Sequence, residues 1–152
     1  MKTLVRNTLA LLAFIPAGQA ADLVSSGDWT ETITAANLIS GAGSNLQSQL
    51  QSLSGVTTLT ISNAPGSWSL RVRRSGGTWP AGVTLLVKRT SAGSGSGTIS
   101  GGDTFVAVTG SDTEIFSGTE ARSNVSLQFK LSGLSVGITP ATYLSSIIFT
   151  VQ

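Results

Sequence analysis

The sequence predicts an all-β fold, an antiparallel sandwich of about seven strands. Two observations lead to this prediction. From Val56 onward, apolar and polar residues alternate with a period of two, as they do in strands that face a core on one side and water on the other. Between these runs stand clusters of glycine, proline, asparagine and serine, the residues that tight turns require.

The expected strands follow one another at the spacing of an immunoglobulin-like sandwich. They lie at 29–34, 58–62, 68–73, 83–88, 105–109, 125–132 and 142–151. Turn residues separate them at 63–66, 75–77, 79–82, 101–103 and 139–140. The run 125–132 has the cleanest alternation. The last run is apolar on both faces, which favours a central strand or one covered on both sides.

Two segments need a separate interpretation. Ser44 and Asn45 are able to cap a short helix with Leu46, Leu50 and Leu53 on one face, although the same stretch also reads as alternation, so both interpretations stay open. The segment 91–102 is built around Gly-Ser-Gly-Ser-Gly. Its backbone entropy predicts a mobile loop that does not pack.

The amino-terminal 20 residues have the three parts of a secretory signal peptide. Lys2 and Arg6 form a basic region, an apolar run follows at 8–15, and Gly18-Gln19-Ala20 is a small-residue cleavage site. Cleavage after Ala20 leaves 152 − 20 = 132 residues, the size of one domain, at 21–152. The sequence therefore predicts a secreted protein that passes through the periplasm to the cell surface or the medium.

The charge and composition of this domain indicate which kinds of partner it can bind. The net charge of +2 comes from 9 basic and 7 acidic residues, but Lys2 and Arg6 belong to the signal peptide, which leaves 7 against 7. Without a basic surplus, nucleic acid is not an expected partner. A cysteine-free chain has no disulfides, so packing and strand pairing must stabilise it. Its neutral, hydroxyl-rich surface lets copies approach one another closely.

The residue inventory predicts neither an enzyme nor a cofactor or metal site. The chain has no histidine and no cysteine, which removes the Ser-His-Asp relay, thiol chemistry and the usual zinc ligands. A hydrolase would need two carboxylates in one cleft, whereas the acids here stand mostly in or beside expected loops. A calcium site at Asp103, Asp112 and Glu114 is a weaker alternative, because their spacing matches no known calcium loop.

The three tryptophans are the residues best suited to contacts. Trp68 shares a strand face with Leu70, so it is expected in the core. Trp79 stands in a turn, where its ring either covers one end of the sandwich or contacts a ligand such as a sugar, or a neighbouring subunit. Trp29 either anchors the first strand or fills a groove in another copy.

The carboxyl-terminal sequence Pro140-Ala141-Thr142-Tyr143-Leu144, leading into Ile147-Ile148-Phe149-Thr150-Val151, looks like the final strand of a known kind of protein. Together with the signal peptide and the Thr/Ser/Gly-rich strands, it resembles the secreted β-sandwich subunits of bacterial surface fibres. These include archaic chaperone-usher pilins and spore coat protein U-like domains. The resemblance implies a fimbrial or pilus subunit, a structural protein with a role in cell adhesion.

The unpaired edges of an open sheet also favour assembly of copies into a fibre. A sandwich of short strands has unpaired edges, and an extended segment of another copy satisfies such an edge by strand addition. Residues 22–40 are the expected movable arm, with Gly41-Ala42-Gly43 as its hinge. The expected subunit contacts are Leu23, Val24, Trp29, Ile33, Leu38, Ile147, Phe149 and Val151. The competing hypothesis is a secreted glycan- or surface-binding module that uses Trp79 and the loop 91–102.

Overall fold

The computed structural model describes residues 21–152, so the expected signal peptide at 1–20 lies outside the described residues. The fold is all-β, and every strand pair is antiparallel. The elements are β1 (Asp22–Ser26), η1 (Ala35–Asn37, a 3-10 turn), β2 (Gln49–Gln51), β3 (Thr57–Ser62), β4 (Ser67–Ser75), β5 (Thr84–Arg89), β6 (Ile99–Gly101), β7 (Val106–Ala107), β8 (Thr113–Thr119), β9 (Arg122–Ser132) and β10 (Ser146–Val151). The predicted all-β sandwich is confirmed, with ten strands in place of about seven.

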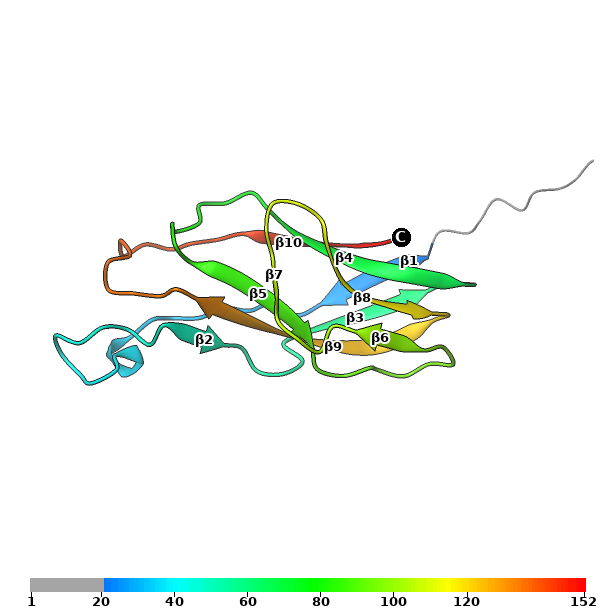
Figure 1. The fold of residues 1–152 in the computed structure, drawn as a ribbon, viewed down its shortest axis with the longest axis horizontal. Helices are drawn as coiled ribbons and strands as arrows, with labels where there is room; N and C mark the ends of the chain where they lie inside the picture. The colour runs from blue at the N-terminus through cyan, green and yellow to red at the C-terminus, as the bar shows by residue number, and fades with distance from the viewer. Residues whose placement is uncertain (1–20) are drawn as a thin grey trace, which may run out of the picture.

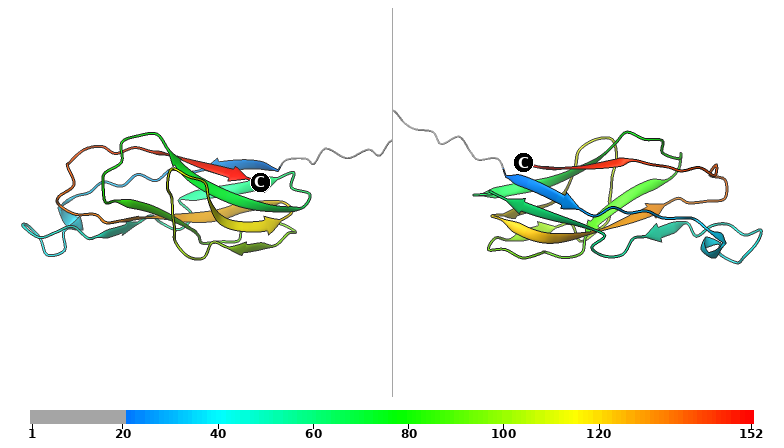
Figure 2. Two further views of the ribbon diagram at one scale, coloured as in Figure 1. Left: turned by 45° about the horizontal axis from the view of Figure 1, so that its top comes forward. Right: turned by 180° about the vertical axis from the view of Figure 1, so that it is seen from behind.

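The strands form two sheets that face each other (Figure 1). The first sheet has the order β1-β3-β9-β5-β7, with β2 also paired to β9; the second has the order β10-β4-β8-β6. The first and last strands, β1 and β10, are in contact at one margin, each at the edge of its own sheet (Figure 2). They do not pair with each other, so the sandwich is open along this margin.

The core lies between the sheets and follows from the alternation. Leu59 and Ile61 of β3 are fully buried, and so are Leu70 of β4 and Leu127 of β9. Each such side chain contributes about 1.5 to 3 kcal/mol when it leaves water. Trp68 is also buried, as expected. Its ring stands edge-on to the ring of Phe116 with 6.2 Å between centroids.

The predicted strands agree with the structure in the middle of the chain and differ at both ends. The runs 58–62, 68–73, 83–88 and 125–132 lie in β3, β4, β5 and β9, whereas 105–109 shrinks to the two residues of β7. The predicted strand 29–34 is wrong. The first strand is β1, and Trp29 instead stacks on Phe129, with centroids 6.3 Å apart and an interplanar angle of 10°.

The helical reading of 44–53 is wrong, and the alternating reading is closer. Leu50 is the middle residue of β2 and stands opposite Leu131 of β9. Leu53 is 83% exposed, so it does not share a buried face with Leu50. Pairing with β9 satisfies the backbone of this short segment in a way that an isolated helical turn would not.

The segment 91–102 is packed, which overturns the prediction of a mobile loop. Its last part is β6, and Ser94 forms an isolated bridge with Ser123. Arg122, only 8% exposed, donates five hydrogen bonds of 2.7 to 3.4 Å to the carbonyl oxygens of Ala92, Gly93, Gly95 and Gly97. One buried guanidinium therefore holds the backbone of this segment against the sandwich.

Candidate functional site

The free edge of β10 is the main candidate site. β10 pairs with β4 alone, in continuous register from Ser146 opposite Ser75 to Val151 opposite Leu70. Beyond it, Ser69 and Gln152 exchange both of their backbone hydrogen bonds, at 2.8 and 3.0 Å. Hydrogen-bonded and non-bonded pairs alternate along an antiparallel ladder. The N–H and C=O groups of Ile147, Phe149 and Val151 therefore point away from β4, toward the open margin.

This edge lacks the usual protections. Natural edge strands are kept from pairing by charges, prolines, bulges or very short length. Among the described residues, β2, β6 and β7 are edge segments of only three, three and two residues. β10 has six residues, Ser-Ile-Ile-Phe-Thr-Val, with no charge and no proline. The uncharged, β-branched composition of this strand favours pairing with another strand.

The place of β10 corrects one prediction. An apolar run was expected to be central or covered on both sides, but β10 is an edge strand whose residues are at most half-buried. Ile147, Phe149 and Val151 pack against the core. Ile148 lies on the other face, opposite Arg73 in the ladder. The outer face of β10 is thus apolar at Ile148, lies beside arginines of β4, and is not covered by another of the described elements.

The outer face of the second sheet carries ion pairs next to β10. Arg71 lies 4.0 Å from Glu114, and Arg73 lies 3.4 Å from Asp112, with all four side chains partly exposed. Asp103 pairs elsewhere, with Arg89. The structure does not bring Asp103, Asp112 and Glu114 together as a calcium site, and the described residues contain no group of three potential metal-ligating His, Cys, Asp or Glu side chains.

The first part of the expected arm lies on its own sandwich. β1 pairs with β3, with Leu23 opposite Ile61 and packed against the core, while Val24 points outward and is exposed. Trp29 anchors the chain to Phe129. Farther along, Ile33 is 42% exposed. Of the expected contacts in this segment, Val24 and Ile33 are therefore open to a partner.

The expected hinge at 41–43 is the turn of a hairpin. Leu38 bridges to Leu46, and the Ile39 N–H donates to the carbonyl of Asn45 at 2.9 Å. Ser44 closes the turn, because its N–H and its hydroxyl both donate to the carbonyl of Gly41, at 3.1 and 2.7 Å. These bonds fix the segment that was expected to move. Leu38 itself is half-buried inside the hairpin.

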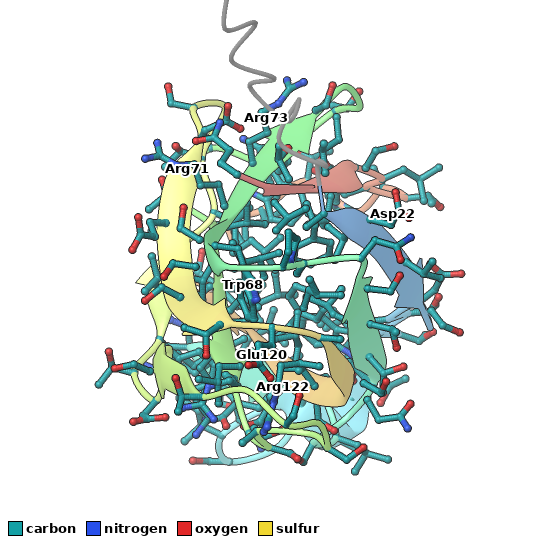
Figure 3. The ribbon with its side chains drawn as sticks, turned by 90° about the vertical axis from the view of Figure 1, so that its right-hand side faces the viewer. Asp22, Trp68, Arg71, Arg73, Glu120 and Arg122 are labelled. Carbon is teal, nitrogen blue, oxygen red and sulfur yellow. The ribbon has the colours of Figure 1, made fainter. Side chains whose placement is uncertain are left out.

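A pocket of about 290 Å³ opens where the β1–β10 margin ends. Figure 3 shows the molecule from this end, with Asp22 and Trp68 labelled. Its lining is Ala21, Ala64, Pro65, Gly66, Ser67, Trp68, Val151 and Gln152. Trp68 forms one wall and is fixed by its Nε1–H, which donates to the carbonyl of Glu120 at 2.8 Å. Sequence reasoning did not find this pocket, because it unites the first and last described residues with the β3–β4 turn.

Trp79 has the position expected of a lid. Its Nε1–H donates to the carbonyl of Val83 at 2.7 Å, and the Arg74 guanidinium lies over the ring, 4.7 Å from the centroid. The ring is half-buried and packs on the core. A second, more polar pocket of about 300 Å³ lies beside this turn, between Pro80 and Tyr143.

Comparison with protein-family models, curated proteins and solved structures found no match for this chain. The resemblance to fibre subunits therefore stays a prediction from sequence. Within residues 21–152, no helix has the length and apolar character needed to cross a membrane.

Proposed function

We propose that this protein is a non-catalytic structural subunit of a bacterial surface fibre or layer. Its copies associate by strand addition at the free edge of β10, and the assembly serves adhesion. One observation supports this proposal above the others: β10 presents the unpaired backbone of Ile147, Phe149 and Val151 on a strand without charge or proline.

Strand addition suits this edge energetically. An incoming strand supplies partners for main-chain groups that now depend on water, and it extends the apolar inner row of Phe149 and Val151. No charge of β10 has to be desolvated in the process. A contact between the edge of one copy and a different segment of the next is heterologous, so it propagates into a filament instead of closing a dimer.

The pairing segment comes from residues 22–40 of the neighbouring copy, the expected arm. Within one chain, β1 already pairs with β3, while residues 28–33 belong to no strand or helix and form no backbone hydrogen bond to another described residue. Residues 30–33, beyond the stacked Trp29 and before η1, are therefore the part of the arm that remains for a partner.

A charge placed on the outer face of β10 tests the proposal. Ile148→Lys leaves the core side chains in place but puts an ammonium group on the edge strand, beside Arg73. We expect at least a tenfold loss of filament mass, measured by sedimentation and electron microscopy. The matched control is Leu53→Lys, which adds the same charge at an exposed loop position away from β10. Equal loss in both variants, or none in either, would contradict the role of the edge.

A glycan-binding module is the second candidate function, favoured by the pocket beside the Trp79 turn. This pocket is lined by Pro80, Ala81, Ser135, Gly137, Ile138, Thr139 and Tyr143. A ring, hydroxyl groups and backbone amides are the groups that bind sugars. Trp79→Ala separates the two functions. Loss of carbohydrate binding with assembly intact supports the module, and carbohydrate binding that is unchanged by the substitution, or absent in the wild-type protein, contradicts it.

A further inference from the structure

Three segments at one end of the molecule contain no charged residue, although the guanidinium of Arg74 lies over Trp79 in one of them. They are the hairpin 37–47, the turn 76–82 and the loop 133–145, which together we call the uncharged end. The three segments lie together. The Val136 N–H donates to Oδ1 of Asn45 at 3.0 Å, and a Cβ on Gly133 would stand 2.2 Å from the carbonyl oxygen of Gly82. Figure 1 shows this end on the left, opposite the carboxyl terminus.

The uncharged end exposes aliphatic side chains. Ile39, Val136 and Leu144 are 65%, 62% and 70% exposed. Ile39 and Val136 both donate their backbone N–H to Asn45, the first to its carbonyl oxygen and the second to its Oδ1. Depletion of charge around exposed apolar side chains is typical of the centre of a protein interface.

The hairpin 37–47 presents Ile39 in a fixed conformation. Backbone hydrogen bonds join its two sides, from Ile39 to Asn45 at 2.9 Å and from Gln47 to Asn37 at 2.8 Å. The hairpin projects beyond the sheets (Figures 1 and 2). A projecting segment that is already ordered loses little conformational entropy when it binds.

The pocket at the other end has matching chemistry. No lining residue has a charged side chain, and Pro65, Trp68 and Val151 give the pocket apolar walls. Its volume of about 290 Å³ exceeds that of one aliphatic side chain. Because Val151 is the last residue of β10, the pocket continues the free edge at which strand addition is proposed.

We propose that the hairpin 37–47 of one copy docks at this pocket of the next copy, with Ile39 inserted beside Trp68. This inference rests on the proposed function and adds a second contact to strand addition at β10, made by a hairpin that begins at the end of the arm 22–40. Neither the hairpin 37–47 nor the lining of the pocket has a charged side chain, so burial of the aliphatic side chains does not require a charged side chain to lose its water. Because the two surfaces stand at opposite ends, one chain cannot satisfy both, and repetition of the contact builds a filament.

Cysteine cross-linking tests the contact, since the chain has no native cysteine. Ile39→Cys places a thiol on the hairpin, and Ser67→Cys places one at the pocket rim, at the exposed start of β4. Treated with a short bis-maleimide, filaments of the double variant should give a ladder of covalent oligomers. An equimolar mixture of the two single variants should stop at the dimer, because each copy then has one reactive group.

A charge substitution gives a second, independent readout. Ile39→Lys should lower filament mass at least tenfold, whereas Leu53→Lys, which changes an exposed leucine outside both surfaces, should leave it unchanged. Normal filament formation by Ile39→Lys, together with no ladder from filaments of the double variant Ile39→Cys with Ser67→Cys, would overturn this inference while leaving strand addition at β10 standing. A wild-type protein that forms no filaments at all would overturn the proposed function itself.

Discussion

Replacing Arg122 by alanine should destabilise the whole domain and release the segment 92–97. The guanidinium donates five hydrogen bonds to backbone carbonyls, four of them at 3.1 Å or shorter, and the residue is 8% exposed. Hydrogen bonds that involve a charged group contribute about 1.5 to 3 kcal/mol each. Desolvation of the cation offsets part of that sum, and the bonds are not additive.

We therefore expect the free energy of unfolding to fall by about 4 kcal/mol, within the range for breaking a buried charged network. For a domain of this size, the melting temperature should fall on the order of 10 to 15 °C. Urea denaturation measures the first quantity and calorimetry the second. Digestion with a nonspecific protease should cut Arg122→Ala first within 92–97, since these carbonyls then lose their donor.

The matched control is Arg73→Ala. Arg73 is a half-exposed arginine whose ion pair with Asp112 spans 3.4 Å, and such surface pairs contribute about 0 to 1 kcal/mol. The structural role assigned to Arg122 is wrong if two results are found together. The free energy of unfolding of Arg122→Ala would lie within 1 kcal/mol of that of Arg73→Ala, and the segment 92–97 would resist the protease.

Two further predictions concern the segments that pack on this framework. Gly97→Ala should destabilise the domain by about 3 kcal/mol or more in urea denaturation, because a Cβ there would lie 1.6 Å from the carbonyl oxygen of Thr119. The control Gly110→Ala should be near neutral, because a Cβ at that position meets open space. Val24→Cys with Thr60→Cys, which face each other across β1 and β3, should form a disulfide within one chain, both before and after assembly, as read by non-reducing electrophoresis.

The cysteine pair decides whether β1 itself is exchanged. Cross-linked oligomers after assembly would show that β1 of one copy pairs with β3 of another, against the contact proposed for the hairpin 37–47. The control pair, Thr84→Cys with Ser132→Cys, joins β5 to β9 in the middle of the first sheet and should stay intramolecular in every state.

Sequence periodicity predicted the central strands because each has one face in the core. β8 was missed for a physical reason. Leu70 of β4 pairs with Phe116 of β8, and the next residue, Arg71, pairs with Glu114. Ile115 of β8 is therefore left without a partner in β4, which is a β-bulge. This bulge leaves two consecutive residues, Ile115 and Phe116, both buried, and the alternation is lost.

The candidate site was only partly predictable. Ile147, Phe149 and Val151 were expected at subunit contacts, and the structure places them on a long open edge, but their apolar pattern could not distinguish a covered strand from an edge. The role of Arg122 was not predictable, because its acceptors are carbonyls of a Gly/Ser segment whose path is set by tertiary packing. The pocket beside Trp68 likewise requires the two chain ends to meet.

Amide hydrogen exchange along β10 tests most directly whether its free edge is the surface that copies share. In the monomer, the amides of Ile147, Phe149 and Val151 should exchange rapidly, while those of Ile148 and Thr150, paired to β4, should be protected. In assembled material, all five should be protected. Protection of the first three in the monomer, or their continued rapid exchange in filaments, would contradict the proposed assembly.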